Sequence, residues 1–158
     1  MRVLYLSIIL VILDQITKVL TRARMDLHES IPVVRNFFHF THVTNDGMAF
    51  GLNFPAGIYV FTAVSVIAAV GLAWYLWAVR REALLLRTGL ACIFAGAIGN
   101  LIDRVLFGQV TDFLDFIFWG HHFPVFNIAD SSVTIGMVLF LYFSIIIQPR
   151  LEAAQTVS

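Results

Sequence analysis

The stretch Val110–Asp130 holds the side chains of this sequence that are best suited to chemistry. It reads VTDFLDFIFWGHHFPVFNIAD and contains carboxylates at Asp112, Asp115 and Asp130, but no Lys or Arg. Long apolar segments flank it on both sides. Because an ionised carboxylate in apolar surroundings is costly without a cation, these residues are candidates for a functional site.

Two of these carboxylates could act as a pair. Two Asp side chains close together in a partly dehydrated place share a proton, because both cannot ionise cheaply. One then acts as a base toward water and the other as an acid toward a substrate, which is the chemistry of aspartyl proteases. Asp112 and Asp130 are the candidates, and Asp115 is an alternative to Asp112 because it lies one helical turn further on. Spacing alone does not choose between Asp112 and Asp115.

The remaining side chains give little support to other chemistries. His39 and His42 would point to opposite faces of a strand, and the adjacent His121 and His122 cannot easily bind one ion, so we expect no metal. Cys92 is the only cysteine and lies in an apolar run, which is typical of a packing residue. Phosphoryl transfer would need more basic groups or a Gly-rich loop. We therefore expect no cofactor.

Composition indicates an integral membrane protein with a single domain, residues 1–158. Of these residues 59% are hydrophobic and 13% are charged, with a net charge of zero, which gives no reason to expect a nucleic-acid partner. Four segments are long and apolar enough to span a bilayer. The first contains Asp14 and Lys18, unlike the apolar core of a cleaved signal peptide, so we read it as retained. The predicted helices are about residues 3–21, 57–79, 88–106 and 129–147.

Two connecting segments complete the predicted fold. Residues 24–56 form a β-rich element, because Phe37–Thr44 is aromatic and β-branched and a turn signal, Asn45-Asp46-Gly47, follows it. Residues 107–128 contain Phe113–Trp119, whose apolar content suits a gate lying on the membrane surface. The expected fold class is an all-α membrane protein with four transmembrane helices, a small β-rich element outside the membrane and an interfacial segment.

The arrangement of charges predicts the orientation. Four spans place both termini on one side, and the loop that contains Arg80, Arg81 and Arg87 is cytoplasmic by the positive-inside rule. Arg22, Arg24 and Arg35 count against this orientation, because they lie in the first outer segment.

With this topology the intramembrane polar residues reach one depth, near the outer face. Some of them could simply be ion pairs that hold the bundle together, namely Asp14 with Lys18 and Asp103 with Arg104. Their common depth nevertheless indicates one site at the outer boundary of the membrane. The residues at this depth are Asp14, Lys18, Asn100, Asp103, Arg104 and Asp130, with Asn45 and Asp112 directly above them.

Five motifs of the chain resemble those of the type II lipoprotein signal peptidases, which are aspartyl proteases of the bacterial inner membrane. They occur in the family's order and run from the first span to the fourth. The motifs are Asp14-Gln15-x-x-Lys18, Asn45-x-Gly47-x-Ala49-Phe50-Gly51, Gly96-Ala97-Ile98-Gly99-Asn100-Leu101-Ile102-Asp103-Arg104, Val110-x-Asp112-Phe113 and Phe126-Asn127-x-Ala129-Asp130.

The resemblance implies an endopeptidase that removes the signal peptide from prolipoproteins, cutting before a diacylglyceryl-modified Cys. It implies that Asp112 and Asp130 are catalytic and places the protein in the bacterial cytoplasmic (inner) membrane, with membrane lipids as partners and peptide-like inhibitors such as globomycin. It also implies that the β-rich element and the interfacial segment are periplasmic. The alternative function is a small proton-coupled transporter that uses the same polar cluster, although the inner halves of the spans offer no polar path. The supporting residues implied by the resemblance are Asp14, Lys18, Asn45, Gly47, Asn100, Asp103, Arg104, Asn127 and Ala129.

Overall fold

Helices form most of the computed structural model, which describes residues 2–46 and 57–156. Four helical segments are long and apolar enough to cross a membrane, as the sequence predicts. The fourth is continuous from α4 through a short π-helical turn, η2, into α5. The helices are α1 (Val3–Arg24), α2 (Gly57–Ala78), α3 (Leu84–Phe107), α4 (Ile128–Tyr142), η2 (Phe143–Ile147) and α5 (Gln148–Thr156).

The fourth helix continues beyond the end that the sequence suggests. We expected the span to end before Pro149, because proline lacks an N–H and disrupts a regular helix. The π-helical turn lies directly before it, and the Gln148 N–H bonds the Phe143 carbonyl there. This wider turn precedes the proline, and α5 carries the chain on to Thr156.

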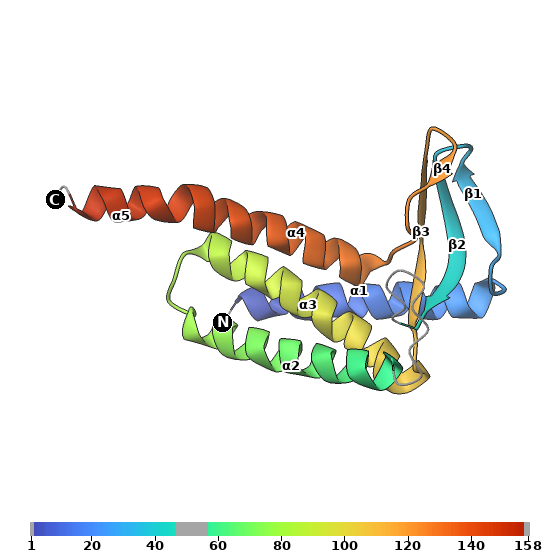
Figure 1. The fold of residues 1–158 in the computed structure, drawn as a ribbon, viewed down its shortest axis with the longest axis horizontal. Helices are drawn as coiled ribbons and strands as arrows, with labels where there is room; N and C mark the ends of the chain where they lie inside the picture. The colour runs from blue at the N-terminus through green and yellow to red at the C-terminus, as the bar shows by residue number, and fades with distance from the viewer. Residues whose placement is uncertain (1, 47–56, 157–158) are drawn as a thin grey trace.

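A four-stranded antiparallel sheet stands across one end of the helices, and both termini lie at the other end (Figure 1). The loop between α2 and α3 is at the same end as the termini. The strand order follows the chain order. The strands are β1 (Ser30–Val34), β2 (Phe38–Asn45), β3 (Val110–Phe118) and β4 (His121–His122).

The sheet therefore includes the segment for which we predicted an interfacial gate. Phe113 lies in β3, and most residues of this strand are buried rather than alternating between buried and exposed. Because both faces of β3 are covered, its apolar residues do not alternate regularly with its polar residues, as they would in a half-exposed strand. The expected strand at Phe37–Thr44 corresponds to β2.

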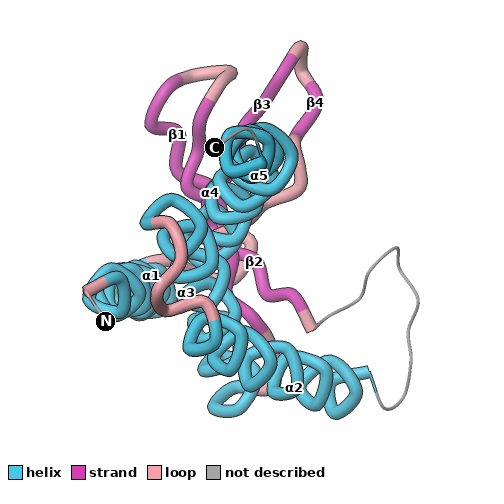
Figure 2. The backbone as a smooth tube through the Cα atoms, turned by 90° about the vertical axis from the view of Figure 1, so that its left-hand side faces the viewer, coloured by secondary structure: helices cyan, strands magenta, loops and turns pink. Residues whose placement is uncertain are grey.

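Helix α3 is the centre of the bundle and contacts α1, α2 and α4 (Figure 2). Its approach to α4 depends on glycine, since a Cβ at Gly96 would lie 2.3 Å from the Ala129 carbonyl oxygen. The close contact fixes the start of α4 against α3. The apolar core, which includes Leu76, Leu90 and Phe143, lies toward the end with the termini. The polar residues gather at the end nearest the sheet.

Candidate active site

Asp112 and Asp130 reach the same place from different elements. Asp112 lies near the start of β3, and Asp130 lies in the first turn of α4. The Asn127 side chain donates to Asp112 Oδ1 over 2.6 Å, and the Asn100 side chain donates to Asp130 Oδ1 over 2.7 Å. The two amides are joined as well, with 3.1 Å between Asn127 Nδ2 and Asn100 Oδ1. A chain of hydrogen bonds therefore connects the two carboxylates.

The start of α4 explains why Asn127 points at Asp112. Its side-chain oxygen accepts the Asp130 N–H over 2.9 Å, and Asp130 Oδ2 accepts the Asn127 N–H over 3.2 Å, which together form a capping box. With the oxygen used as a helix cap, the NH₂ group of Asn127 is left to donate to Asp112. Asn127 thus caps the helix and orients one carboxylate.

The two carboxylates have different surroundings. Asp112 is 3% exposed, and burial, with the nearby charge of Asp130, raises the pKa of Asp112 from its usual 3.8 to about 7. Hydrogen bonds from Asn127 and Asn45 and the charge of Lys18 oppose this rise in pKa. Asp130 is only half-buried. It lines a cavity of about 480 Å³ whose other walls are Phe123, Pro124, Val125, Phe126, Ser131, Thr134 and Ile135.

A second group of charges, the bracing cluster of Asp14, Lys18 and Asp103, lies beneath the pair. Lys18 Nζ is 2.9 Å from Asp14 Oδ2 and 3.3 Å from Asp103 Oδ2, and all three side chains are almost completely buried. Asp14 accepts the backbone N–H of Ala129 over 2.9 Å, and Asp103 accepts that of Thr111 over 3.0 Å. Each of these backbone groups directly precedes one of the candidate catalytic residues. The cluster therefore holds both chain segments to a common centre.

Known proteins are similar in sequence to this chain over most of its length. The family described as Signal peptidase (SPase) II matches residues 6–146. The chain belongs to the signal peptidase II family. It is 47% identical over 145 residues to a lipoprotein signal peptidase of Desulforapulum autotrophicum, covering 89% of this chain and 90% of the relative. It is 44% identical over 137 residues to that of Halothermothrix orenii, covering 86% and 90%.

Solved structures agree with the family assignment. Two bacterial membrane enzymes superpose with TM-scores of 0.80 and 0.81, at 34% and 33% identity. The first match covers 91% of this chain and 87% of the other, and the second covers 93% and 94%. The predicted membrane fold and the resemblance to signal peptidase II are confirmed, and the transporter alternative finds no support.

The predicted ion pair between Asp103 and Arg104 is wrong in this signal peptidase II family member. We expected Asp103 to pair with Arg104, but it pairs with Lys18 and with Arg22, whose Nη1 is 3.5 Å from Asp103 Oδ1. Consecutive residues of a helix point about 100° apart, so neighbours in sequence rarely share a partner. Arg104 Nη1 instead donates to Ser65 over 3.3 Å. Its charge acts on Asp130 and Asp112 from nearby.

Arg22 was not among the predicted site residues. Its guanidinium donates to the Thr111 hydroxyl over 2.9 Å and lies 4.3 Å from the centre of the Phe107 ring. It lies four residues after Lys18, on the same face of α1. That spacing is the signal that could have identified it.

Asp115, the alternative to Asp112, has other partners. Its carboxylate accepts from the Thr41 hydroxyl over 2.7 Å and lies 2.8 Å from His122 Nδ1. We expected Asp115 to share a face with Asp112 on a helix, but residues three apart on a strand point to opposite faces. The two side chains therefore lie on opposite sides of β3.

The other predicted residues are placed as follows. Asn45 ends β2 opposite Val110, and its side chain hydrogen-bonds Asp112. Ala129 contributes its backbone N–H to Asp14. Gly47 lies outside the described residues. The structure thus brings the described site residues to the sheet end of the bundle, while their individual roles stay predictions.

Proposed function

We propose that this signal peptidase II family member cuts prolipoproteins before a Cys that carries a diacylglyceryl group, with Asp112 and Asp130 as its catalytic pair. The observation that carries the assignment of residues is the hydrogen-bonded chain that joins the two carboxylates through Asn127 and Asn100. Two such groups at the end of a membrane bundle have the chemistry of an aspartyl protease.

The different surroundings assign the two roles. With a pKa of about 7, Asp112 carries a proton in about half of the molecules at neutral pH, and this protonated form acts as the acid. Asp130 faces the cavity and acts as the base. It takes a proton from water while the water oxygen attacks the scissile carbonyl carbon, and Asp112 donates its proton to the carbonyl oxygen.

The second half of the reaction returns the protons. The tetrahedral diol collapses when Asp130 gives its proton to the leaving nitrogen and Asp112 takes a proton from one hydroxyl. The C–N bond breaks, which leaves a carboxylic acid on the signal peptide and a free amino group on the lipid-modified Cys, and the acid then loses its proton to water. Both Asp residues regain their starting protonation states, so no cofactor is consumed.

The supporting residues keep this geometry fixed. Asn127 and Asn100 orient the two carboxylates, and Asn45 adds a hydrogen bond to Asp112. The bracing cluster fixes the backbone on the bundle side of the pair. A water-attack geometry is sensitive to displacements of about 1 Å, which is why such a rigid base is useful.

The same proposal includes orientation in the cell. The termini lie in the cytoplasm of a bacterium, together with Arg80 and Arg81 of the α2–α3 loop and Arg87 in the first turn of α3. The sheet lies on the periplasmic side of the inner membrane, in line with the positive-inside rule. Trp119, 96% exposed at the β3–β4 turn, suits the membrane interface. A Cys introduced at Asn36 should therefore react with an impermeant maleimide added outside spheroplasts. If that Cys does not react, the proposed orientation is wrong and the sheet faces the cytoplasm.

Peptide-like inhibitors such as globomycin should compete for the cavity at Asp130. This cavity lies between the apolar segment 123–126 and the start of α4, where the signal peptide of a membrane-anchored substrate would enter. Competitive inhibition of cleavage is the expected result, and inhibition independent of substrate concentration would place the inhibitor elsewhere.

The decisive test is cleavage of a diacylglyceryl-modified prolipoprotein, followed by gel shift. Wild-type protein should cleave it, while Asp112→Asn and Asp130→Asn should fold, insert and bind substrate but lose at least about 10²–10⁴-fold in rate. An exposed carboxylate changed in the same way, Glu82→Gln, is the matched control and should cleave normally. Retained turnover in either Asp variant would contradict the assignment.

A further inference from the structure

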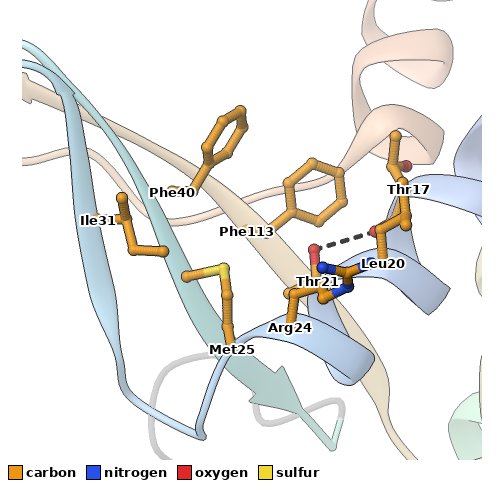
Figure 3. A pocket seen from close by; sticks show the side chains of 8 residues that line it. All are labelled: Thr17, Leu20, Thr21, Arg24, Met25, Ile31, Phe40 and Phe113. Atoms are coloured by element: carbon orange, nitrogen blue, oxygen red, sulfur yellow. Dashed lines mark hydrogen bonds between the residues drawn. The ribbon is translucent and has the colours of Figure 1, made fainter.

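A second apolar pocket lies between the outer end of α1 and the sheet (Figure 3). Its volume is about 380 Å³, above the roughly 300 Å³ at which ligand pockets begin. Side chains from the helix form one wall, and side chains from three strands form the other. The lining residues are Thr17, Leu20, Thr21, Arg24, Met25, Ile31, Phe40 and Phe113.

This pocket is separate from the proposed active site. Phe113 forms part of its wall, whereas the preceding residue, Asp112, bonds Asn127. Neighbouring residues of a strand point to opposite faces, so the pocket and the carboxylate pair lie on opposite sides of β3. Neither Asn100 nor Asp130 lines it.

The pocket adjoins the end of α1 nearest the sheet, beside the apolar surface of this membrane-spanning helix. The preceding turns of α1 expose Ile16 and Leu20 at 50% and 52%, as expected of a membrane-spanning helix that faces lipid. Beside it, every residue of β1 is exposed, including Ile31 and Val33. An apolar edge strand that is exposed beside this end of the helix would contact the bilayer surface.

The pocket has one charged lining residue, Arg24, which has no partner among the described residues. Arg24 is exposed, and no hydrogen bond or ion pair joins it to another residue in the described part of the chain. Arg22, on the preceding part of the same turn, is in contrast bound to Asp103 and Thr111. An unpaired guanidinium above an apolar hollow complements a phosphate joined to an acyl chain.

We propose that this pocket binds one anionic phospholipid of the bilayer, with an acyl chain against Phe113, Phe40 and Ile31 and the phosphate on Arg24. The diacylglyceryl group of a prolipoprotein substrate carries no charge, so it would leave Arg24 without a partner. A bilayer phospholipid satisfies both the apolar wall and the cation. The bound lipid packs against β3 from the side opposite the catalytic pair.

Native mass spectrometry of the purified full-length protein tests the proposal. The probes are dioleoyl phosphatidylglycerol and dioleoyl phosphatidylcholine, which have the same acyl chains. Wild-type protein should retain one phosphatidylglycerol in preference to phosphatidylcholine, and Arg24→Gln should lower this preference about fivefold, the contribution typical of one basic residue at an anionic surface.

Two further variants separate charge from shape. Arg35→Gln removes an exposed charge on the β1–β2 turn that does not line the pocket, and it should retain the lipid as wild type does. Leu20→Trp fills the pocket and should reduce retention of both lipids. All three variants should still cleave prolipoprotein, because none of these residues belongs to the proposed catalytic machinery.

Three outcomes would overturn the proposal. One is equal retention of the two lipids by wild type, and another is equal loss of preference in Arg24→Gln and Arg35→Gln. The third uses Asp112→Asn protein, in which a diacylglyceryl-modified peptide cannot be cut. If that peptide displaces the bound phosphatidylglycerol and Leu20→Trp blocks its binding, the pocket belongs to the substrate instead.

Discussion

The bracing cluster and the catalytic pair contain the same type of side chain and use it differently. Asp14 and Asp103 each lie within 3.5 Å of Lys18, and each accepts a backbone N–H. Among the described residues Asp112 and Asp130 form no ion pair, and their hydrogen bonds come from amide groups. Burial is therefore not what distinguishes a structural carboxylate from a reactive one, because Asp14 and Asp112 are both buried.

The partner of each carboxylate makes this difference. A cation in contact keeps a buried carboxylate ionised and fixed, which suits a residue that holds a backbone in place. A neutral amide orients a carboxylate but does not neutralise it, so two such neighbours compete for one proton. The first arrangement gives rigidity, and the second gives an acid and a base.

Removing the cation of the bracing cluster, Lys18, should have the largest effect on stability and on cleavage. Lys18→Met leaves Asp14 and Asp103 buried without their shared partner, and breaking a buried pair in this way costs about 3–5 kcal/mol. We expect thermal unfolding in detergent at a much lower temperature, together with loss of cleavage, because both backbone anchors depend on the cluster.

A double variant is the control for Lys18→Met. In Lys18→Met/Asp14→Asn one uncompensated charge is gone, so part of the lost thermal stability should return. Arg81→Met removes an exposed cation at the other end of the bundle. This variant should leave the thermal stability unchanged. If Lys18→Met unfolds at the wild-type temperature, the cluster does not brace the site.

The pH dependence of kcat/KM should come from the catalytic pair alone. If Asp112 acts as the acid with a pKa of about 7, kcat/KM should fall about tenfold for each pH unit above that value. Asn127→Ala removes a hydrogen bond that lowers the pKa of Asp112, so the decline should begin at a higher pH. A decline that begins at the same pH in both proteins would assign it to another group.

The thermal stability of the protein should also depend on the proton of Asp112, and it can be measured without a cleavage reaction. The pKa of Asp112 is higher in the folded protein than its usual 3.8, so the folded state binds this proton more tightly than the unfolded state. The contribution is fully present below about pH 4 and is lost as the pH rises to about 7. The melting temperature of wild type relative to Asp112→Asn should fall over that window, and a constant difference would contradict the raised pKa.

Much of the fold could be predicted because its signals are local. Four long apolar segments predict four spans whatever their packing, and the aromatic and β-branched residues near Phe38 predict a strand. The sheet partner β3 was harder to identify, because a strand buried on both faces has the same apolar pattern as an interfacial segment or a short buried helix.

The site was predictable in its members but not in its contacts. Polar residues at one depth indicated where it lies, and the resemblance implied Asp112 and Asp130. Sequence could not show that Asp103 takes Lys18 and Arg22 as partners, since that depends on how α1 and α3 are rotated against each other. Sequence likewise could not show that Asp112 and Asp115 point to opposite faces, since that depends on the segment being a strand.

Asp115→Asn should have the smallest effect, and it separates the two faces of β3. An Asn side chain can still accept from the Thr41 hydroxyl and can donate to His122, so only the charge is lost. We expect normal cleavage and a loss of stability of at most about 1 kcal/mol, the upper value usual for an ion pair with a solvent-exposed partner. Asp112→Asn is the matched variant three residues away on the same strand, and it should be inactive but stable. Equal loss of cleavage in both variants would mean that Asp115 also reaches the reaction, and loss in Asp115→Asn alone would move the catalytic role to the other face of the strand.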